Sequence, residues 1–393
     1  MAQHHQDFDP TQSETFDSAW DQFADLRARC PVAHTEEMGR FWALTRYDDV
    51  RRAASESATF VTSQQNVVPK VAFTGRRPPL HLDPPEHTPY RRALNPLLSL
   101  TRAESFAPVA RRYARELLAP LVAHGGGDVC TEYASFLPVQ VFGEWMNVPD
   151  HWVEPLHKAG RAFILAVNMN DPEAMKATSL KLYDMARELI ELRKVEPRDP
   201  ASDITSALLD AIERGDALQE ELILGMVRQV LVVGIVAPTV VMGSIAVHLS
   251  RDRELQNRLR ADPALIPAAV EEFLRLYTPY RGFARTAVED VEFGGCPIPK
   301  DEAIALVYAS ANRDDAVFPD GSTFILNRPN IGDHLAFGRG PHNCPGIHLG
   351  RMEVRVMLEE LLAATTGFEL AGEIVPARWP EIGAISVPLR FTA

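Results

Sequence analysis

The sequence contains few cysteines, and they are far apart. Cys30, Cys130, Cys296 and Cys344 are the only four in 393 residues, and no two of them form a C-x-x-C pair. Small secreted domains that are held together by disulfides carry cysteines at a much higher density. This distribution argues against a zinc-binding module and against a disulfide framework, and it predicts a protein of the reducing cytoplasm.

The sequence also lacks an apolar leader and an excess of positive charge. Its first residues, Met1 to Asp9, are polar and acidic, unlike the apolar core of a signal peptide. The formal net charge is −13 and the pI is about 5.4. Such a balance argues against nucleic acid and against anionic membrane surfaces as partners.

Only one long run is free of charged residues. It covers residues 230–247 and approaches the length of a transmembrane helix. Gly234, Pro238 and Gly243 interrupt it, and a helix that is apolar on all sides is also typical of the centre of a large domain. We therefore interpret the run as a buried helix and expect no membrane association.

What the sequence does contain is a long pattern of helical periodicity. Apolar residues recur with the period of an α-helix through most of residues 87–260, and strand-like segments fall mainly within residues 36–70 and 280–330. A proline-rich irregular loop is expected over residues 67–85. We predict one large domain, residues 1–393, that is mainly α with small β-sheets. The helices expected are 16–29, 47–55, 102–123, 174–193, 219–250, 268–277 and 347–365.

One cysteine stands in a loop with unusual features. The sequence from Phe337 to Gly346 reads FGRGPHNCPG, and a helical pattern follows directly. A cysteine at the start of a helix is easily deprotonated, and the thiolate is the form that binds metals. Glycines allow the backbone to approach a flat cofactor closely. A single cysteine is more often only a small buried side chain, but this loop indicates a thiolate ligand, Cys344.

The loop and a second motif resemble the cytochrome P450 family. Phe337, Gly338, Gly340, His342, Cys344 and Gly346 match its heme-binding signature, and Glu272-x-x-Arg275 matches its upstream motif, with Arg328 at the expected distance before the loop. The resemblance extends over essentially the whole chain. It implies the cytochrome P450 fold, heme b as the cofactor and Cys344 as the axial ligand of its iron.

The upstream motif places an acid and a base on one face of a helix. Glu272 and Arg275 lie three residues apart, a spacing that allows an ion pair. A solvent-exposed pair of this kind contributes little to stability. The resemblance instead implies a buried structural triad with Arg328 that holds the region of the cysteine loop.

Basic residues are available for the two propionates of a heme. His87 and Arg91 lie four residues apart at the start of a helix, and Arg285 lies in a strand-like segment. Exposed basic residues are the alternative for each of them taken singly. The resemblance assigns these three and His342 to the propionates, and it assigns Phe337, Gly338 and Gly346 to the heme loop.

The long apolar helix departs from the family pattern. Gly234 matches, but Val236 and Ala237 occupy the positions where relatives carry an acid and an alcohol that deliver protons. Pro238 has no N–H for the carbonyl of Gly234, so the helix should kink there, and the freed carbonyl could hold a water that replaces the side-chain relay. Thr239 is a second candidate if the kink turns it toward the iron. The alternative is that Pro238 merely bends a core helix and that oxygen chemistry is poor.

The resemblance implies a heme-thiolate monooxygenase that uses O2 on a small apolar or aromatic substrate, by hydroxylation or oxidative O-dealkylation. We expect Phe73, Val233 and Phe283 among the pocket walls, together with Gly234 and Ala237. Two alternatives stay open: a peroxygenase driven by hydrogen peroxide, and a heme-thiolate protein that binds or senses without turnover.

Electrons must come from another protein, and the chain resembles heme domains that are fused to a flavin and [2Fe–2S] reductase. We expect either a [2Fe–2S] ferredoxin or a reductase of the phthalate-dioxygenase type as the donor, and a monomeric enzyme. An acidic donor could dock on a basic face beside the cysteine loop, although scattered surface arginines are nearly as plausible. The candidates for that face are Arg91, Arg92, Arg102, Arg111, Arg112 and Arg351.

Overall fold

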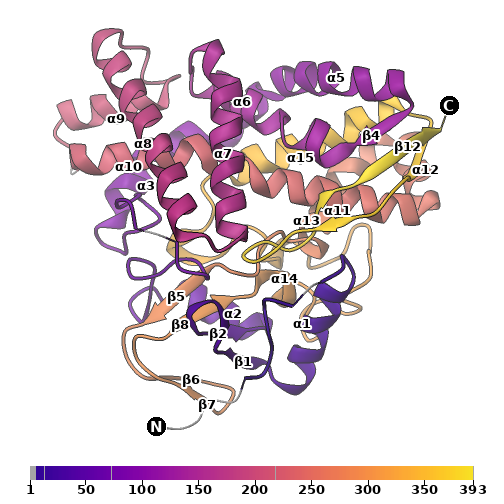
Figure 1. The fold of residues 1–393 in the computed structure, drawn as a ribbon, viewed down its shortest axis with the longest axis horizontal. Helices are drawn as coiled ribbons and strands as arrows, with labels where there is room; N and C mark the ends of the chain where they lie inside the picture. Colours follow the sequence, from indigo (N-terminus) through magenta and orange to yellow (C-terminus); the bar gives the residue numbers. More distant parts are fainter. Residues whose placement is uncertain (1–5, 13, 72, 217, 393) are drawn as a thin grey trace.

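The computed structural model describes residues 6–12, 14–71, 73–216 and 218–392. Figure 1 shows long helices in the upper part of the molecule and the largest sheet, with α1 and α2, in the lower part. The predicted class, mainly α with small β-sheets, is confirmed. The helices are α1 Ser18–Arg29, α2 Tyr47–Ser55, α3 His87–Leu94, α4 Leu100–Ser105, α5 Ala107–His124, α6 Leu137–Trp145, α7 Val153–Asn168, α8 Pro172–Val195, α9 Ile204–Glu213, α10 Glu220–Val233, α11 Val236–Arg251, α12 Arg253–Ala261, α13 Ile266–Leu276, α14 Tyr308–Ala311 and α15 Ile347–Ala364.

The strands form one five-stranded sheet and three smaller ones. The large sheet has the order β1-β2-β8-β5-β3 and the three-stranded sheet the order β4-β12-β9, while β6 pairs with β7 and β10 pairs with β11. In the large sheet only the β2–β8 pair is parallel. The strands are β1 Val32–Thr35, β2 Phe41–Leu44, β3 Phe60–Val61, β4 Gly126–Asp128, β5 Ala284–Ala287, β6 Val291–Phe293, β7 Cys296–Ile298, β8 Ala303–Leu306, β9 Gly367–Leu370, β10 Val375–Pro376, β11 Ala384–Ser386 and β12 Pro388–Thr392.

Two helices that were expected to be continuous are broken. The helix predicted over residues 102–123 is divided at Phe106 into α4 and α5, and the helix predicted over residues 219–250 is divided at Gly234 and Ile235 into α10 and α11. The second break lies one turn before Pro238, where the proline removes a hydrogen bond to the carbonyl four residues earlier. Apolar periodicity continues through both breaks, so it could not reveal them.

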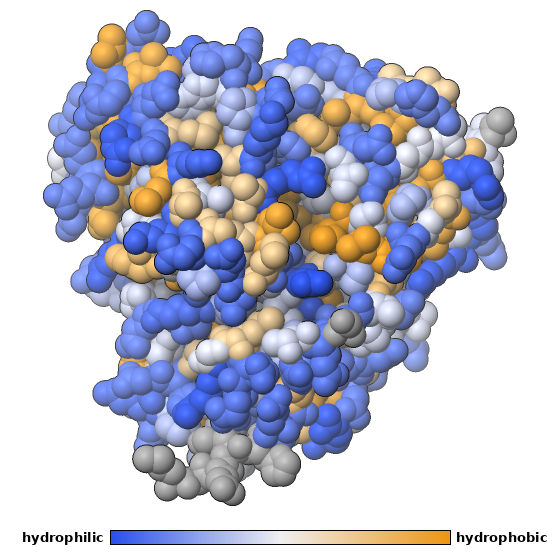
Figure 2. Space-filling model, viewed as in Figure 1, coloured by the Kyte–Doolittle hydropathy of each residue, from blue (hydrophilic) through white to orange (hydrophobic). Residues whose placement is uncertain are grey.

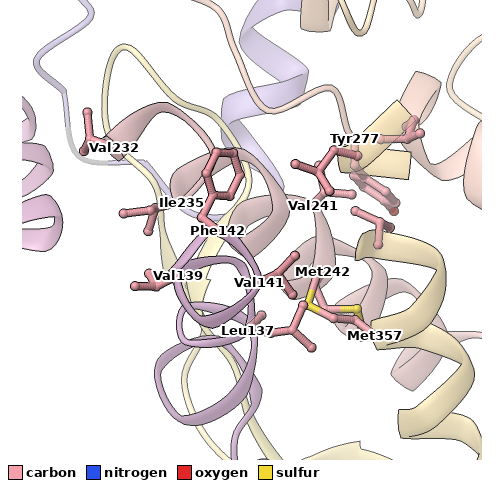
Figure 3. Packing of buried hydrophobic residues seen from close by; sticks show 14 of the residues in the cluster. Leu137, Val139, Val141, Phe142, Val232, Ile235, Val241, Met242, Tyr277 and Met357 are labelled. Carbon is pink, nitrogen blue, oxygen red and sulfur yellow. The ribbon is translucent and has the colours of Figure 1, made fainter. Parts of the chain in front are cut away.

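The apolar run on this pair of helices lies inside the molecule. Residues 220–251 are long and apolar enough to cross a membrane, but 72% of their most apolar window is buried within the protein. Figure 3 shows Ile235, Val241 and Met242 of this region packed in a cluster with α6 residues such as Phe142. The surface is mainly polar, with apolar side chains gathered near the middle of the face in Figure 2. The run is therefore the central core helix of a folded domain.

Candidate functional site

The cysteine loop is a tight turn closed by its own backbone. The N–H of Cys344 donates to the carbonyl of Phe337 at 2.8 Å. Gly338 and Gly340 have φ angles of +71° and +72°, a region that favours glycine. A Cβ on Gly340 would also lie 2.6 Å from the carbonyl oxygen of Ala54. The turn delivers Cys344 to the start of α15, which begins one residue after Gly346.

The surroundings of Cys344 act on the pKa of its thiol in both directions. Burial raises the pKa of the Cys344 thiol, while the Gly346 backbone N–H and the charges of Arg91 and Arg351 act in the opposite direction. A metal ion adds positive charge at the sulfur and deprotonates a coordinating thiol. Cys344 can therefore serve as a thiolate ligand once iron is bound.

Basic side chains surround the loop without carboxylate partners to match them. The rings of His87 and His342 lie 4.6 Å apart, and Arg91 donates to the carbonyl of Asn343 at 2.8 Å. Buried Arg285 donates to the carbonyl of Ala284 at 2.9 Å. Among the residues that the structure describes, only His342 of these four basic groups has a nearby carboxylate, that of Asp83 at 3.6 Å.

One of these basic groups also carries an unused polar atom. Nε2 of His87 is buried and has no hydrogen-bond partner within the described part of the chain. Burial, together with the neighbouring His342 and Arg91, lowers the pKa of His87 to about 4. Unpaired donors and uncompensated cations beside a thiol fit a flat, dianionic cofactor that contains iron, such as heme b.

The upstream motif forms a closed network in the core. Arg275 donates to both carboxylate oxygens of Glu272 at 2.7 and 2.8 Å, and Nε of Arg328 donates to Glu272 at 3.0 Å. All three side chains are buried. Their remaining donors reach backbone carbonyls between Asn312 and Thr323, so the triad holds the segment before the cysteine loop and not the loop itself.

The break between α10 and α11 shapes an apolar face on this helix pair. Gly234 has φ −84° and ψ −3°, and a Cβ there would lie 2.2 Å from the ring of Phe142. Val233 is 51% exposed although most of its helix is buried, and Ala237, one turn later on the same face, is partly exposed. Free space therefore lies beside this apolar face. The contact with Phe142 carries no signal in the sequence, because the two residues are far apart along the chain.

Thr239 does not lie on that face. Its hydroxyl is within hydrogen-bond distance of the carbonyl oxygens of Ile235, at 2.9 Å, and Ala134, at 3.0 Å, and the side chain is buried. The kink has not turned it toward Val233 and Ala237. The expectation that Thr239 could deliver protons does not fit this placement.

The two aromatic residues expected in the pocket walls differ in position. Phe283 pairs through its backbone with Val67, and its ring lies 4.4 Å from that of Tyr280, at the edge of the large sheet. Phe73 is 73% exposed on the irregular loop. Its place in a pocket wall stays a prediction.

A polar contact that the sequence did not reveal lies close to Tyr280. Glu381 is buried, its backbone bridges to that of Tyr280, and its carboxylate accepts a hydrogen bond from Asn168 at 2.8 Å. Burial raises the pKa of Glu381 to about 7, against the opposing effects of the hydrogen bonds and of Arg281. These residues come from three separate segments, so no sequence motif joins them.

The expected basic face beside the loop is partly neutralised. Arg111 pairs with Glu359 and Glu360 at 2.6 and 2.5 Å, and Arg351 pairs with Glu271 at 2.6 Å. Arg112 pairs with Glu144, whereas Arg91 and Arg102 donate only to backbone carbonyls and Arg92 is exposed. The charge pattern alone therefore does not select an acidic donor.

Comparisons with known proteins agree with this geometry. The family model "Cytochrome P450" matches residues 163–366, more than half of the chain. Mycinamicin IV hydroxylase/epoxidase of Micromonospora griseorubida is 34% identical over 89% of this chain and 88% of its own length. Linalool 8-monooxygenase of Pseudomonas putida is 30% identical over 90% of this chain and 90% of its own length. The structure of cytochrome P450 CYP109Q5 from Chondromyces apiculatus superposes with a TM-score of 0.87 at 28% identity, over 98% of both chains. This chain belongs to the cytochrome P450 family of heme-thiolate monooxygenases, whose cofactor is heme b.

Proposed function

We propose that the protein inserts one oxygen atom from O2 into a small apolar or aromatic molecule, by hydroxylation or by oxidative O-dealkylation. The observation that carries the proposal is the half-exposed apolar face of Val233 and Ala237 in an otherwise buried helix pair. Such a face suits an apolar substrate. The names of the two relatives describe a hydroxylation and a monooxygenation, which supports the reaction class.

In this proposal each residue around the cysteine loop has a defined role. Cys344 would bind the iron, His87, Arg91, Arg285 and His342 would bind the propionates, and Phe337, Gly338 and Gly346 would form the loop beneath the ring. When bound, heme b supplies the activation of O2, and a thiolate ligand favours cleavage of its O–O bond. The protein orients the substrate and excludes water from it.

Protons would reach the site without an acid–alcohol pair. Pro238 has no N–H for the carbonyl of Gly234, and the helix is broken at Gly234 and Ile235. We expect an ordered water on this carbonyl to take the place of the missing side chains. Restoring the family residues by Val236→Glu and Ala237→Thr, and measuring product formed per reductant consumed, tests this route. If neither the wild type nor the variants couple reductant to product, the water route is wrong.

The donor, the assembly state and the compartment are part of the same proposal. We infer that electrons come from a [2Fe–2S] ferredoxin or from a phthalate-dioxygenase-type reductase, and that the protein acts as a cytoplasmic monomer. Reconstitution with each donor, followed by measurement of substrate-dependent NAD(P)H consumption, distinguishes the two. The partly neutralised arginine face predicts that neither rate falls steeply with ionic strength.

The peroxygenase alternative is favoured by one observation, the absence of an acid and an alcohol at Val236 and Ala237. It predicts turnover with hydrogen peroxide alone at a rate at least equal to that with NAD(P)H and a donor protein. A protein that only binds or senses would show heme spectra but no reductant consumption on adding substrate. Product formation with NAD(P)H and a donor, but not with peroxide, supports the monooxygenase.

A further inference from the structure

A second group of basic side chains lies buried away from the cysteine loop. Arg228 of α10 is 0% exposed, and Arg77 of the irregular loop is 8% exposed. The backbone of Arg76 and Arg77 packs directly on α10, since a Cβ on Gly225 would lie 1.9 Å from the carbonyl oxygen of Arg76. His81 completes the group, with Nε2 at 3.1 Å from a guanidinium nitrogen of Arg77.

No negative charge balances this group. Within the described residues, neither Arg77 nor Arg228 forms an ion pair with a carboxylate. The Arg228 guanidinium reaches only neutral oxygens, those of Ser179 at 3.0 Å and of its neighbour Gln229 at 3.3 Å. Burial, together with the charge of Arg77, lowers the pKa of Arg228 to about 9. A buried arginine pair without a counter-ion is costly.

Several polar atoms in the group have no partner. Nε of Arg77, Nε of Arg228 and the hydroxyl of Tyr183 are all buried without a hydrogen bond among the described residues. All three residues are more than nine-tenths buried. Buried polar atoms are rarely left unpaired in a folded protein. The Arg228 guanidinium lies 5.8 Å from the Tyr183 ring, and the charges of Arg77 and Arg228 both lower the pKa of the Tyr183 hydroxyl against the effect of burial. Three unpaired donors in one group point to a missing acceptor.

The position of the group connects it to the proposed active site. The loop that carries Arg77 starts where Val67 pairs with Phe283 and ends at His87, so both of its ends touch that site. Arg228 precedes Val233 by five residues, which is about 7.5 Å along the helix axis and roughly 140° around it, so only an elongated molecule could reach both. The ring of Phe163 covers the Arg228 guanidinium at 4.6 Å. A molecule bound at Val233 could place an acidic end at the arginines.

We propose that Arg77, Arg228 and Tyr183 bind the carboxylate of the substrate, and that the substrate is a small aromatic carboxylic acid. The planar guanidinium matches a carboxylate with two parallel hydrogen bonds, and the acid supplies the charge that the fold lacks. Phe163 and the apolar face at Val233 suit the aromatic body. The site is closed in this structure, so the irregular loop must move to admit the acid. This inference rests on the proposed function, because it names the substrate class of the same site.

The experiment compares acids with their neutral counterparts on the heme-loaded enzyme. Benzoate, phenylacetate and phenylpropionate are titrated beside their primary amides, and binding is followed by the shift in heme spin state and by the rise in Tm. We expect at least one acid to bind about 10- to 100-fold more tightly than its amide, which is the size of a charge-assisted hydrogen-bond contribution. Equal affinity for every acid and its amide, or no binding of any acid, would overturn the inference.

Variants assign that preference to the named side chains. Arg228→Met and Arg77→Met should abolish the preference for acids over amides. Arg76→Met is the control, because Arg76 is exposed and adjacent to Arg77, and it should preserve the preference. Tyr183→Phe removes a hydroxyl that has no partner, so it should leave the fold intact and still weaken acid binding several-fold. Arg228→Met should not lower the Tm without ligand, because it removes an uncompensated buried charge. A preference for acids that survives in Arg228→Met contradicts the inference.

The outcome separates this inference from the proposed function. Turnover of neutral aromatics with NAD(P)H, without any preference for acids, would retain oxygen insertion and reject the carboxylate site. Arginine-dependent binding of an acid, without product under the same conditions, would retain the carboxylate site and reject oxygen insertion.

Discussion

Two pairs of buried arginines differ in their partners. Arg275 and Arg328 share the carboxylate of Glu272 in the core, whereas Arg285 and Arg228 have no carboxylate partner in the described parts of the chain. A buried charge without a partner costs several kcal/mol. The fold itself therefore explains the first pair, and we propose that ligands bring the negative charge for the second.

Glu272→Gln should destabilise the protein by about 3–5 kcal/mol, because it leaves two buried guanidinium groups without their counter-ion. Urea unfolding monitored by circular dichroism measures this loss. Glu369→Gln is the matched control, since Glu369 and Arg390 form an exposed pair at the molecular surface, and it should change the stability little. Equal effects of the two substitutions would show that burial of the triad does not matter.

Glu381 should make the stability depend on pH. Burial raises its pKa from 4.5 to about 7, so the folded state keeps a proton that the unfolded state releases. The contribution of Glu381 to the free energy of unfolding should be highest below pH 4.5, fall as the pH rises from 4.5 to about 7, and then level off. A shift of this size corresponds to roughly 3 kcal/mol.

Denaturant unfolding of wild type and Glu381→Gln across this pH range checks the prediction. The variant should lose the decline between pH 4.5 and 7, because it has no proton to release. Glu373→Gln, at an exposed position nearby, should keep the wild-type profile. Parallel profiles for wild type and Glu381→Gln would contradict the assignment.

Among the structural elements, the junction of α10 and α11 sets the shape of the site. Pro238 leaves the Gly234 carbonyl without its helical partner, and Phe142 of α6 fills the space against Gly234. The break therefore depends on Pro238 within the helix pair and on Phe142 outside it. Together they turn Val233 and Ala237 toward free space while Thr239 stays buried.

Gly234→Ala should destabilise the protein by about 1–3 kcal/mol, because its Cβ would meet the Phe142 ring at 2.2 Å. Phe142→Leu combined with it should recover part of the loss. Gly332→Ala is the control, since a Cβ there meets no atom within 4 Å. Thermal unfolding of the wild type and the three variants measures these effects, and a neutral Gly234→Ala would mean that the ring moves aside without cost.

Across the whole molecule, the sequence predicts features that depend on local pattern, such as helices and turns. It does not predict features that depend on contacts between segments far apart along the chain. Helical periodicity placed α2 at its observed bounds and α15 within one residue, and the glycine-rich loop marked the turn at Cys344. Periodicity did not reveal the breaks at Phe106 and Gly234, because apolar spacing continues through them. The arginine group and the Glu381 contact join segments far apart along the chain, so only the folded structure brings them together.

The central claim for the whole molecule is that the sulfur of Cys344 binds the iron of heme b. The absorption spectrum of the reduced, carbon monoxide-bound protein tests it directly, since a thiolate ligand shifts the Soret band far to the red. Wild type and the control Cys296→Ser should both show this band, because Cys296 lies in β7, outside the site. Cys344→Ser should lose it. A colourless wild type after heme reconstitution, or an unchanged Soret band in Cys344→Ser, would contradict the account.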